Sequence, residues 1–174
     1  MNIKLKREIV GSILDIGGGG ECVIGRLYGP AVVAIDQSQE ELDEAPNCCR
    51  KLRMDAANLM FAPGTFDNVT FFYSLMFMAE ETQRKALKEA FRVLTPGGKL
   101  YLWDVEIPSA ASYPFLAELD IDLAGTKLHT TYGISKDDPQ SGLSIRQIAE
   151  KVGFEAINSS LHQGHFYLCF RKKQ

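Results

Sequence analysis

The sequence predicts one α/β domain built on a doubly wound, mostly parallel β-sheet with helices on both faces. Strand-like apolar segments alternate with segments of helical periodicity, which is the pattern of a parallel sheet with right-handed crossovers. Four consecutive glycines, Gly17 to Gly20, follow the first strand-like segment. Such a run is costly in backbone entropy and is expected where a ligand lies against bare backbone. The last two strand-like segments are joined only by Gln163-Gly164, so one of them must run antiparallel.

The first two helices are predicted from their start and stop signals. A short helix over about 21–28 ends at Gly29-Pro30. Ser38 and Glu41 form the pattern of a capping box, in which the hydroxyl and the carboxylate each satisfy an unpaired backbone N–H group. We therefore expect a second helix that begins after Ser38 and ends at Pro46.

The remaining elements follow from periodicity and turn residues. A helix over about 80–94 places apolar side chains at helical spacing and ends at Thr95-Pro96-Gly97-Gly98. Another helix, over about 144–152, is capped by Ser144 with Gln147 and closed by Gly153. Strands are predicted at about 11–15, 32–36, 50–54, 68–74, 99–106, 154–162 and 165–171.

Length, composition and charge indicate a single globular domain. The 174 residues suffice for one sizeable core, and the apolar fraction of 45% and charged fraction of 24% are ordinary for such a domain. No run approaches the roughly 18 apolar residues that a membrane span needs. The first residues contain no apolar signal core, so we expect a cytoplasmic protein without a membrane partner. The net charge of −3 argues against a nucleic-acid partner.

Cysteine and histidine spacing gives no metal-binding pattern. No cysteine stands in a Cys-x-x-Cys pair, and in a chain without a secretory signal free buried thiols are the default. The adjacent Cys48 and Cys49 are poorly placed to bind one metal ion. His162 and His165 would point to opposite faces if they lay in one strand. The sequence therefore predicts no metal site.

The spacing within the glycine run excludes two familiar ligand classes. A dinucleotide site requires Gly-x-Gly-x-x-Gly, but the third glycine position falls on Cys22 or Val23. This argues against an NAD-dependent oxidoreductase. A phosphate-binding loop requires Lys and Ser or Thr after its last glycine, but Arg26-Leu27 follows Gly25. Asp36 ends the next strand, where a carboxylate can accept both hydroxyls of a ribose, so a nucleoside remains the expected ligand.

What remains is Asp15-Ile16-Gly17-Gly18-Gly19, which resembles the first motif of the class I, Rossmann-like S-adenosylmethionine-dependent methyltransferases. Later segments resemble that family's other motifs in the same order, so the resemblance extends from about residue 11 to the end of the chain. They are Met54–Leu59 with Gly64–Val69, Phe91–Leu100, and Gly142–Glu155. The resemblance implies a seven-stranded sheet of order 3-2-1-4-5-7-6 with strand 7 antiparallel.

The resemblance also implies a cofactor, S-adenosylmethionine, whose product is S-adenosylhomocysteine. The acid after the third strand would accept from the adenine amino group, and the next backbone N–H would reach a ring nitrogen. The implied cofactor-binding residues are Asp15, Gly17, Gly18, Gly19, Asp36, Gln37, Asp55, Ala56, Tyr73 and Ser74.

One departure from the family pattern falls at Glu21, where the family has a further glycine. An anion at the start of a helix is electrostatically favourable. Glu21 could meet the ammonium group of the cofactor, but we expect it to cap the helix instead.

The implied activity is methyl transfer to an O, N or S nucleophile of a small molecule or protein side chain. Patterns for methylation of an exocyclic base amine or of a cytosine carbon are missing, because the chain has neither an Asn/Asp-Pro-Pro-Tyr/Phe loop after strand four nor a Pro-Cys pair. No residue is assigned as catalytic, and Tyr132 and His129 are the candidate general bases to test. The alternative is a non-catalytic cofactor-binding module that serves as a partner or sensor subunit.

Cover for the transferred methyl group must come from residues 108–140, from a second copy in a homodimer, or from a partner protein. A connection of this length is usually functional or has structure of its own. We expect 108–140 to be a substrate-covering insertion within the single domain 1–174, with Tyr113, Phe115 and Tyr132 facing the acceptor. A plain structural excursion with a strand near 127–134 is the alternative.

Overall fold

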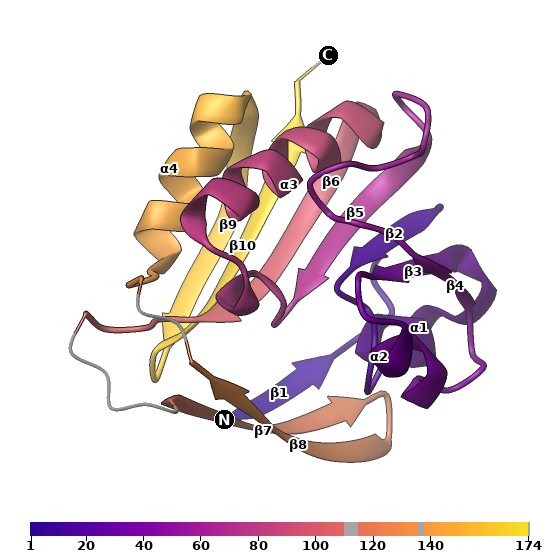
Figure 1. Ribbon diagram of the computed structural model, residues 1–174, viewed down its shortest axis with the longest axis vertical. Helices are drawn as coiled ribbons and strands as arrows, with labels where there is room; N and C mark the ends of the chain where they lie inside the picture. Colours follow the sequence, from indigo (N-terminus) through magenta and orange to yellow (C-terminus); the bar gives the residue numbers. More distant parts are fainter. Residues whose placement is uncertain (110–114, 136–137, 174) are drawn as a thin grey trace.

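The computed structural model describes residues 1–109, 115–135 and 138–173, which form two β-sheets and four α-helices (Figure 1). The larger sheet has seven strands, and β10 runs antiparallel to both of its neighbours while the other adjacent pairs are parallel. Counted along the chain within this sheet, the order is 3-2-1-4-5-7-6, as predicted. From one edge to the other the strands are β4 (Arg50–Arg53), β3 (Val32–Asp36), β2 (Ile13–Ile16), β5 (Phe66–Phe72), β6 (Leu94–Val105), β10 (His165–Lys172) and β9 (Phe154–His162).

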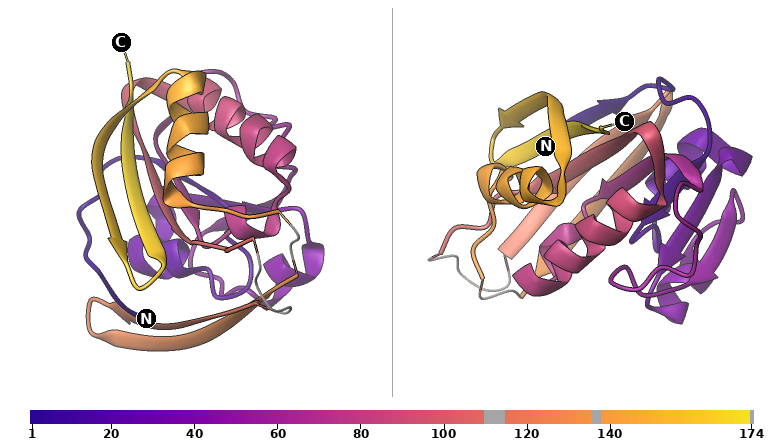
Figure 2. Two further views of the ribbon diagram at one scale, coloured as in Figure 1. Left: turned by 90° about the vertical axis from the view of Figure 1, so that its left-hand side faces the viewer. Right: turned by 90° about the horizontal axis from the view of Figure 1, so that it is seen from above.

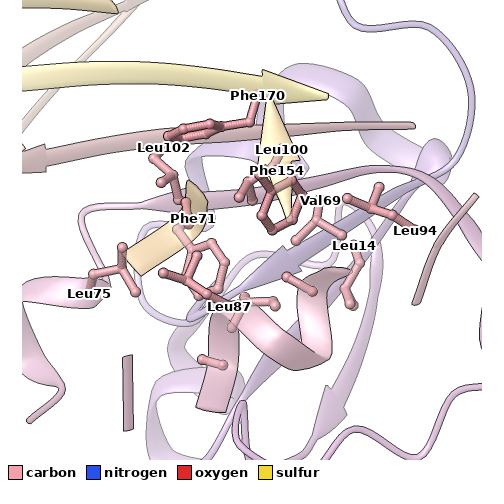
Figure 3. Packing of buried hydrophobic residues seen from close by; sticks show 14 of the residues in the cluster. Leu14, Val69, Phe71, Leu75, Leu87, Leu94, Leu100, Leu102, Phe154 and Phe170 are labelled. Atoms are coloured by element: carbon pink, nitrogen blue, oxygen red, sulfur yellow. The ribbon is translucent and has the colours of Figure 1, made fainter. Parts of the chain in front are cut away.

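One face of the large sheet is covered by α3 (Glu80–Val93) and α4 (Gly142–Val152), which lie side by side in Figures 1 and 2. Figure 3 shows the cluster beneath them, in which Leu87 of α3 packs with Phe71, Leu100 and Leu102 of the sheet. All four side chains are fully buried. Burying each of them contributes about 1.5–3 kcal/mol relative to exposure, so this cluster holds the two helices on the sheet.

The opposite face is covered by α1 (Val23–Tyr28) and by a second, three-stranded sheet. Ile13, Val32 and Ala34 of the large sheet are buried there. Another short helix, α2 (Gln39–Glu44), packs against β3 and β4, and the Ser38 hydroxyl caps it by accepting from the Glu41 N–H at 3.2 Å. No helix among the described residues is long and apolar enough to cross a membrane.

The three-stranded sheet has the order β1 (Asn2–Leu5), β7 (Phe115–Leu123) and β8 (Thr126–Ile134). β1 pairs parallel with β7, and β7 and β8 form a hairpin. In Figure 1 the arrowhead of β5 points toward this hairpin, so the small sheet lies at the carboxyl end of β5. The strand near 127–134 was predicted, but β1 and β7 were not. In β7, Leu119 and Ile121 are buried while Asp120 points outward, a period-two pattern that was available in the sequence.

Three local predictions differ from the structure. Residues 95–98 do not end α3 in a turn but belong to β6, whose register with β5 shifts between the pairs Phe66–Leu94 and Asn68–Lys99. The first helix begins at Val23, not 21, because the backbone at Cys22 is left-handed (φ 49°).

The fourth helix is capped by Ser141 instead of Ser144. The Ser141 hydroxyl accepts from the Ser144 N–H at 3.0 Å, and the Ser144 hydroxyl accepts from the Ser141 N–H at 3.0 Å. Two serines thus form the reciprocal capping box for which the prediction required Gln147. Gly153 closes this helix as predicted.

Candidate functional site

A cavity of about 440 Å³ lies where β2, β3, β4 and β5 end. Parallel strands of an open α/β sheet place ligands at this edge, beside the point where the strand order reverses. Eight of the ten predicted cofactor residues line the cavity: Gly17, Gly19, Asp36, Gln37, Asp55, Ala56, Tyr73 and Ser74.

The glycine loop is locked to the neighbouring strand ends. The Gly17 N–H donates to the Ile35 carbonyl at 2.8 Å, and the Ser74 hydroxyl donates to the Ile16 carbonyl at 2.7 Å. Gly17 has φ 77°, and a Cβ there would lie within 2.9 Å of the Ser74 Oγ. Only glycine allows this close approach, and without a side chain the loop backbone is left accessible from the cavity.

Asp15 and Gly18, the other two predicted residues, do not line the cavity. Asp15 is buried beneath the loop, where the Thr70 hydroxyl donates to its Oδ1 at 2.6 Å. Burial raises the pKa of Asp15 to about 7, and the hydrogen bond from Thr70, which lowers the pKa, offsets only part of this effect. A Cβ at Gly18 would lie 2.6 Å from Asp15 Oδ2. The structure therefore places Asp15 as a support for the loop.

Asp36 is held rigidly at the end of β3. Its Oδ2 accepts from the Gly19 N–H at 3.3 Å, and its Oδ1 accepts from the Ser38 N–H at 2.9 Å. Asp55 is more exposed, at the rim of the cavity, and its Oδ1 accepts from the Ala57 N–H at 2.8 Å. Both carboxylates are thus oriented by backbone groups before any ligand binds.

Glu21 faces the cavity and does not cap α1, contrary to the prediction. Its Oε1 accepts from the Thr130 hydroxyl of β8 at 2.8 Å, and α1 has no side-chain cap. Glu41 of α2 also lines the cavity, and its pKa is raised by burial and then by the charge of Asp36. Three carboxylates therefore surround the Gly19–Gly20 part of the loop, which suits a cation and not a phosphate.

Aromatic side chains line another part of the cavity. Tyr73, with φ 52°, stacks on Tyr132 of β8 at 6.0 Å between ring centroids, and Phe77 meets Tyr132 edge-on at 6.2 Å. Burial raises the pKa of both tyrosines well above 10. The Tyr73 hydroxyl lies 2.9 Å from Nδ1 of His165, whose pKa is lowered by burial.

The structure separates the two candidate bases. Tyr132 lines the cavity, whereas His129 is exposed and lies outside it, with its Nδ1 2.9 Å from Oδ1 of Asp120. Phe115 packs in the core of the small sheet and is not among the cavity-lining residues, and Tyr113 lies outside the described residues. His162 of β9 is the direct cross-strand partner of His165 of β10, so the two histidines do not lie in one strand, which the prediction about their side chains assumed.

Several lining residues were not predicted as part of the site. They lie near strand ends or in the first turns of helices, and no sequence motif marks them as part of a site. They include Gly20, Ser38, Glu41, Met54, Phe77, Met78, Ala79 and Thr82.

Comparison with known proteins agrees with this geometry. The profile of a family described as "Methyltransferase domain" matches residues 14–102, just over half of the chain. An uncharacterized methyltransferase of Schizosaccharomyces pombe is 31% identical over 93% of this chain and 62% of its own length. A demethylmenaquinone methyltransferase of Lactococcus lactis is 28% identical over 88% of this chain and 69% of its own length. The chain thus spans about two thirds of the length of these relatives.

Solved structures share the fold. An S-adenosylmethionine-dependent methyltransferase of Mesorhizobium loti superposes with a TM-score of 0.64 at 15% identity, covering 93% of this chain and 92% of that one. A Haloferax volcanii methyltransferase, solved in complex with the Trm112 activator, gives a TM-score of 0.70 at 16% identity, covering 97% and 86%. The chain belongs to the methyltransferase domain family, with the class I fold and S-adenosylmethionine as its cofactor.

Proposed function

We propose that this chain transfers the methyl group of S-adenosylmethionine to an O, N or S nucleophile of a small molecule. The observation that carries the proposal is the lining of one cavity by two kinds of groups. Carboxylates of Glu21, Asp36 and Glu41 lie along the glycine loop, and aromatic rings gather around Tyr73. The first group matches a cationic cofactor, and the second matches an apolar acceptor.

The chain's residues fit this cofactor. The amino-acid tail carries an ammonium group and the reacting sulfur is a sulfonium, so the carboxylates of Glu21 and Glu41 favour it electrostatically. In this proposal Asp36 would accept the ribose hydroxyls, and Asp55 with the Ala56 N–H would bind the adenine edge. When bound, the cofactor supplies a methyl group already activated for displacement, so the protein contributes mainly orientation and proximity.

The tyrosines position the acceptor and do not serve as bases. A phenol is already protonated at neutral pH, and burial raises the pKa values of Tyr73 and Tyr132 further, so neither side chain supplies a base. A planar, apolar acceptor fits beside these rings. The relative from Lactococcus lactis is named for demethylmenaquinone, which agrees with an apolar acceptor for this chain.

We infer that the insertion at 108–140 covers the acceptor through its β7–β8 hairpin. Two side chains of β8 carry this inference, because Thr130 binds Glu21 and Tyr132 stacks on Tyr73 at the cavity wall. Excluding water from the transferred methyl group would strengthen the alignment of the nucleophile.

A binding panel followed by a turnover assay tests the proposal. S-adenosylmethionine and S-adenosylhomocysteine should raise the melting temperature, whereas NAD and ATP should not. Release of S-adenosylhomocysteine should then depend on an added small-molecule acceptor, screened from phenols, quinols, amines and thiols. Binding without acceptor-dependent release across the panel would favour the non-catalytic module. A melting-temperature shift with NAD alone would overturn the cofactor assignment.

A further inference from the structure

Three cysteine sulfurs converge beside α1, and none of these cysteines lines the cofactor cavity. Cys22 precedes α1, and Cys48 and Cys49 directly precede β4. The Cys22 Sγ lies 3.6 Å from the Cys49 Sγ and 3.8 Å from the Cys48 Sγ. All three sulfurs lie within 4.8 Å of one another, and this is the single such group of His, Cys, Asp or Glu side chains among the described residues.

The backbone is shaped to bring these sulfurs together. The Cys48 N–H donates to the Pro46 carbonyl at 2.8 Å, a tight turn that places two consecutive cysteines on the same side of the chain. A Cβ on residue 25 would lie within 3.1 Å of all three sulfurs, so only glycine leaves room for them at this point of α1. Adjacent cysteines looked poorly placed to bind one metal ion, because this turn could not be read from the sequence.

We propose that Cys22, Cys48 and Cys49 form a binding site for a thiophilic divalent cation of the zinc type, with the fourth coordination position open to an exogenous ligand. Zinc–thiolate bonds of about 2.3 Å in a tetrahedral arrangement place the sulfurs about 3.8 Å apart. The two measured separations, 3.6 and 3.8 Å, already have this value. Three thiolates with one open position also match the ligand count of zinc sites that retain a water molecule.

A cation would bind these three sulfurs as thiolates. Metal binding itself favours loss of the thiol protons, because it displaces protons from its ligands.

The site can be reached from outside and is connected to the cofactor loop. Cys22 is buried, but Cys48 and Cys49 are partly exposed. The Cys22 N–H donates to the Gly19 carbonyl at 3.1 Å, and Gly19 lines the cofactor cavity. A cation held here would tie the end of the glycine loop to the segment before β4, whose cysteines lie 26 and 27 positions further along the chain.

Titration of the full chain with Co²⁺ tests the proposal. The reduced, metal-free protein should bind one equivalent, giving thiolate-to-metal charge-transfer absorption and the intense visible bands of tetrahedral cobalt. One equivalent of Zn²⁺ should abolish both. Cys48→Ser and Cys49→Ser should each weaken binding at least about tenfold, since loss of even an outer partner of a ligand costs 10- to 100-fold. Zn²⁺ should raise the melting temperature of the wild type but not of these variants.

Cys169→Ser is the matched control, because Cys169 lies on β10 outside the cluster and is also a free, buried thiol. This variant should bind Co²⁺ like the wild type. Cys22→Ser is a poorer test because Cys22 is buried and its loss could unfold α1. S-adenosylhomocysteine affinity, measured for each variant, reports that the fold is retained. Saturation only with a large excess of metal, or unchanged affinity in Cys48→Ser and Cys49→Ser, would overturn the proposal.

Discussion

Tyr132 of the small sheet stacks on Tyr73 at the end of β5, with ring centroids 6.0 Å apart and an interplanar angle of 18°. This pair joins the large sheet to the small sheet, and its two residues are far apart in the chain. Replacing Tyr132 by Ala removes the stacking contact and opens the cavity beside it. Aromatic pairs contribute about 0.5–1.5 kcal/mol beyond their buried area.

We therefore expect Tyr132→Ala to raise the KM for the acceptor by about two- to tenfold, which corresponds to the loss of one ring contact of this energy with a planar acceptor. Tyr132→Phe keeps the ring and should stay near wild type. Steady-state release of S-adenosylhomocysteine measures both variants. If the Phe variant were as impaired as the Ala variant, the hydroxyl and not the ring would be the important group.

Asp36→Ala should weaken cofactor binding at least about tenfold, which corresponds to 1.4 kcal/mol. The variant loses the carboxylate that we place on the ribose hydroxyls, where charge-assisted hydrogen bonds are worth about 1.5–3 kcal/mol each. Isothermal titration calorimetry with S-adenosylhomocysteine gives the affinity. Asp43→Asn is the control, since Asp43 is an exposed residue of α2 that bonds Gln39 and does not line the cavity. Equal affinities for the two variants would mean that the ribose lies elsewhere.

Gly17→Ala should destabilise the fold more than Gly97→Ala. Both glycines have left-handed backbones, with φ 77° and 78°. A Cβ at position 17 would collide with Ser74, whereas at position 97 no atom lies within 4 Å. The second variant thus carries only the backbone strain, roughly 1–3 kcal/mol. Urea unfolding gives the two free energies, and their difference isolates the steric contact with Ser74. No difference would show that Ser74 can move aside without cost.

Asp15 should make stability fall as the pH rises. Burial raises its pKa from 3.8 to about 7 in the folded state, so between these values the folded protein binds more protons than the unfolded chain. The free energy of unfolding then decreases with pH and levels off above about 7.

Asp15→Asn removes this titration while its side-chain oxygen can still accept from Thr70. Between the two pKa values, each pH unit changes the free energy of unfolding of the wild type by about 1.4 kcal/mol. The stability of Asp15→Asn relative to the wild type should therefore rise by about 2–3 kcal/mol between pH 5 and pH 8 in urea unfolding experiments. A constant difference across this range would contradict the raised pKa.

The strand order was predictable because motifs at several strand ends resemble those of a family whose sheet has this order. Val32–Asp36 was predicted to the residue, since an apolar run between Pro30 and Ser38 has clear limits. β7 was missed because its acids, Asp120 and Asp122, give the segment a polar composition that hides the alternation.

Within the site, predictions succeeded where a residue has a motif and failed where tertiary pairing decides its position. Asp36 and Ser74 lie in the cavity because they follow strands. Glu21 was expected to cap a helix, but it binds Thr130 of β8. This partner lies more than 100 positions further along the chain. No local pattern contains such a pairing.

The parallel pairing of β1 with β7 has a consequence for how the chain folds. Asn2 lies opposite Asp120, and the ammonium group of Met1 donates to the Glu118 carbonyl at 2.8 Å. During synthesis β1 leaves the ribosome long before β7 is made. Its backbone groups therefore stay unpaired while the intervening elements fold. Contacts this distant in sequence slow folding because their loop-closure entropy is lost before they form. The sheet that carries Tyr132 is thus among the last parts of the molecule to assemble.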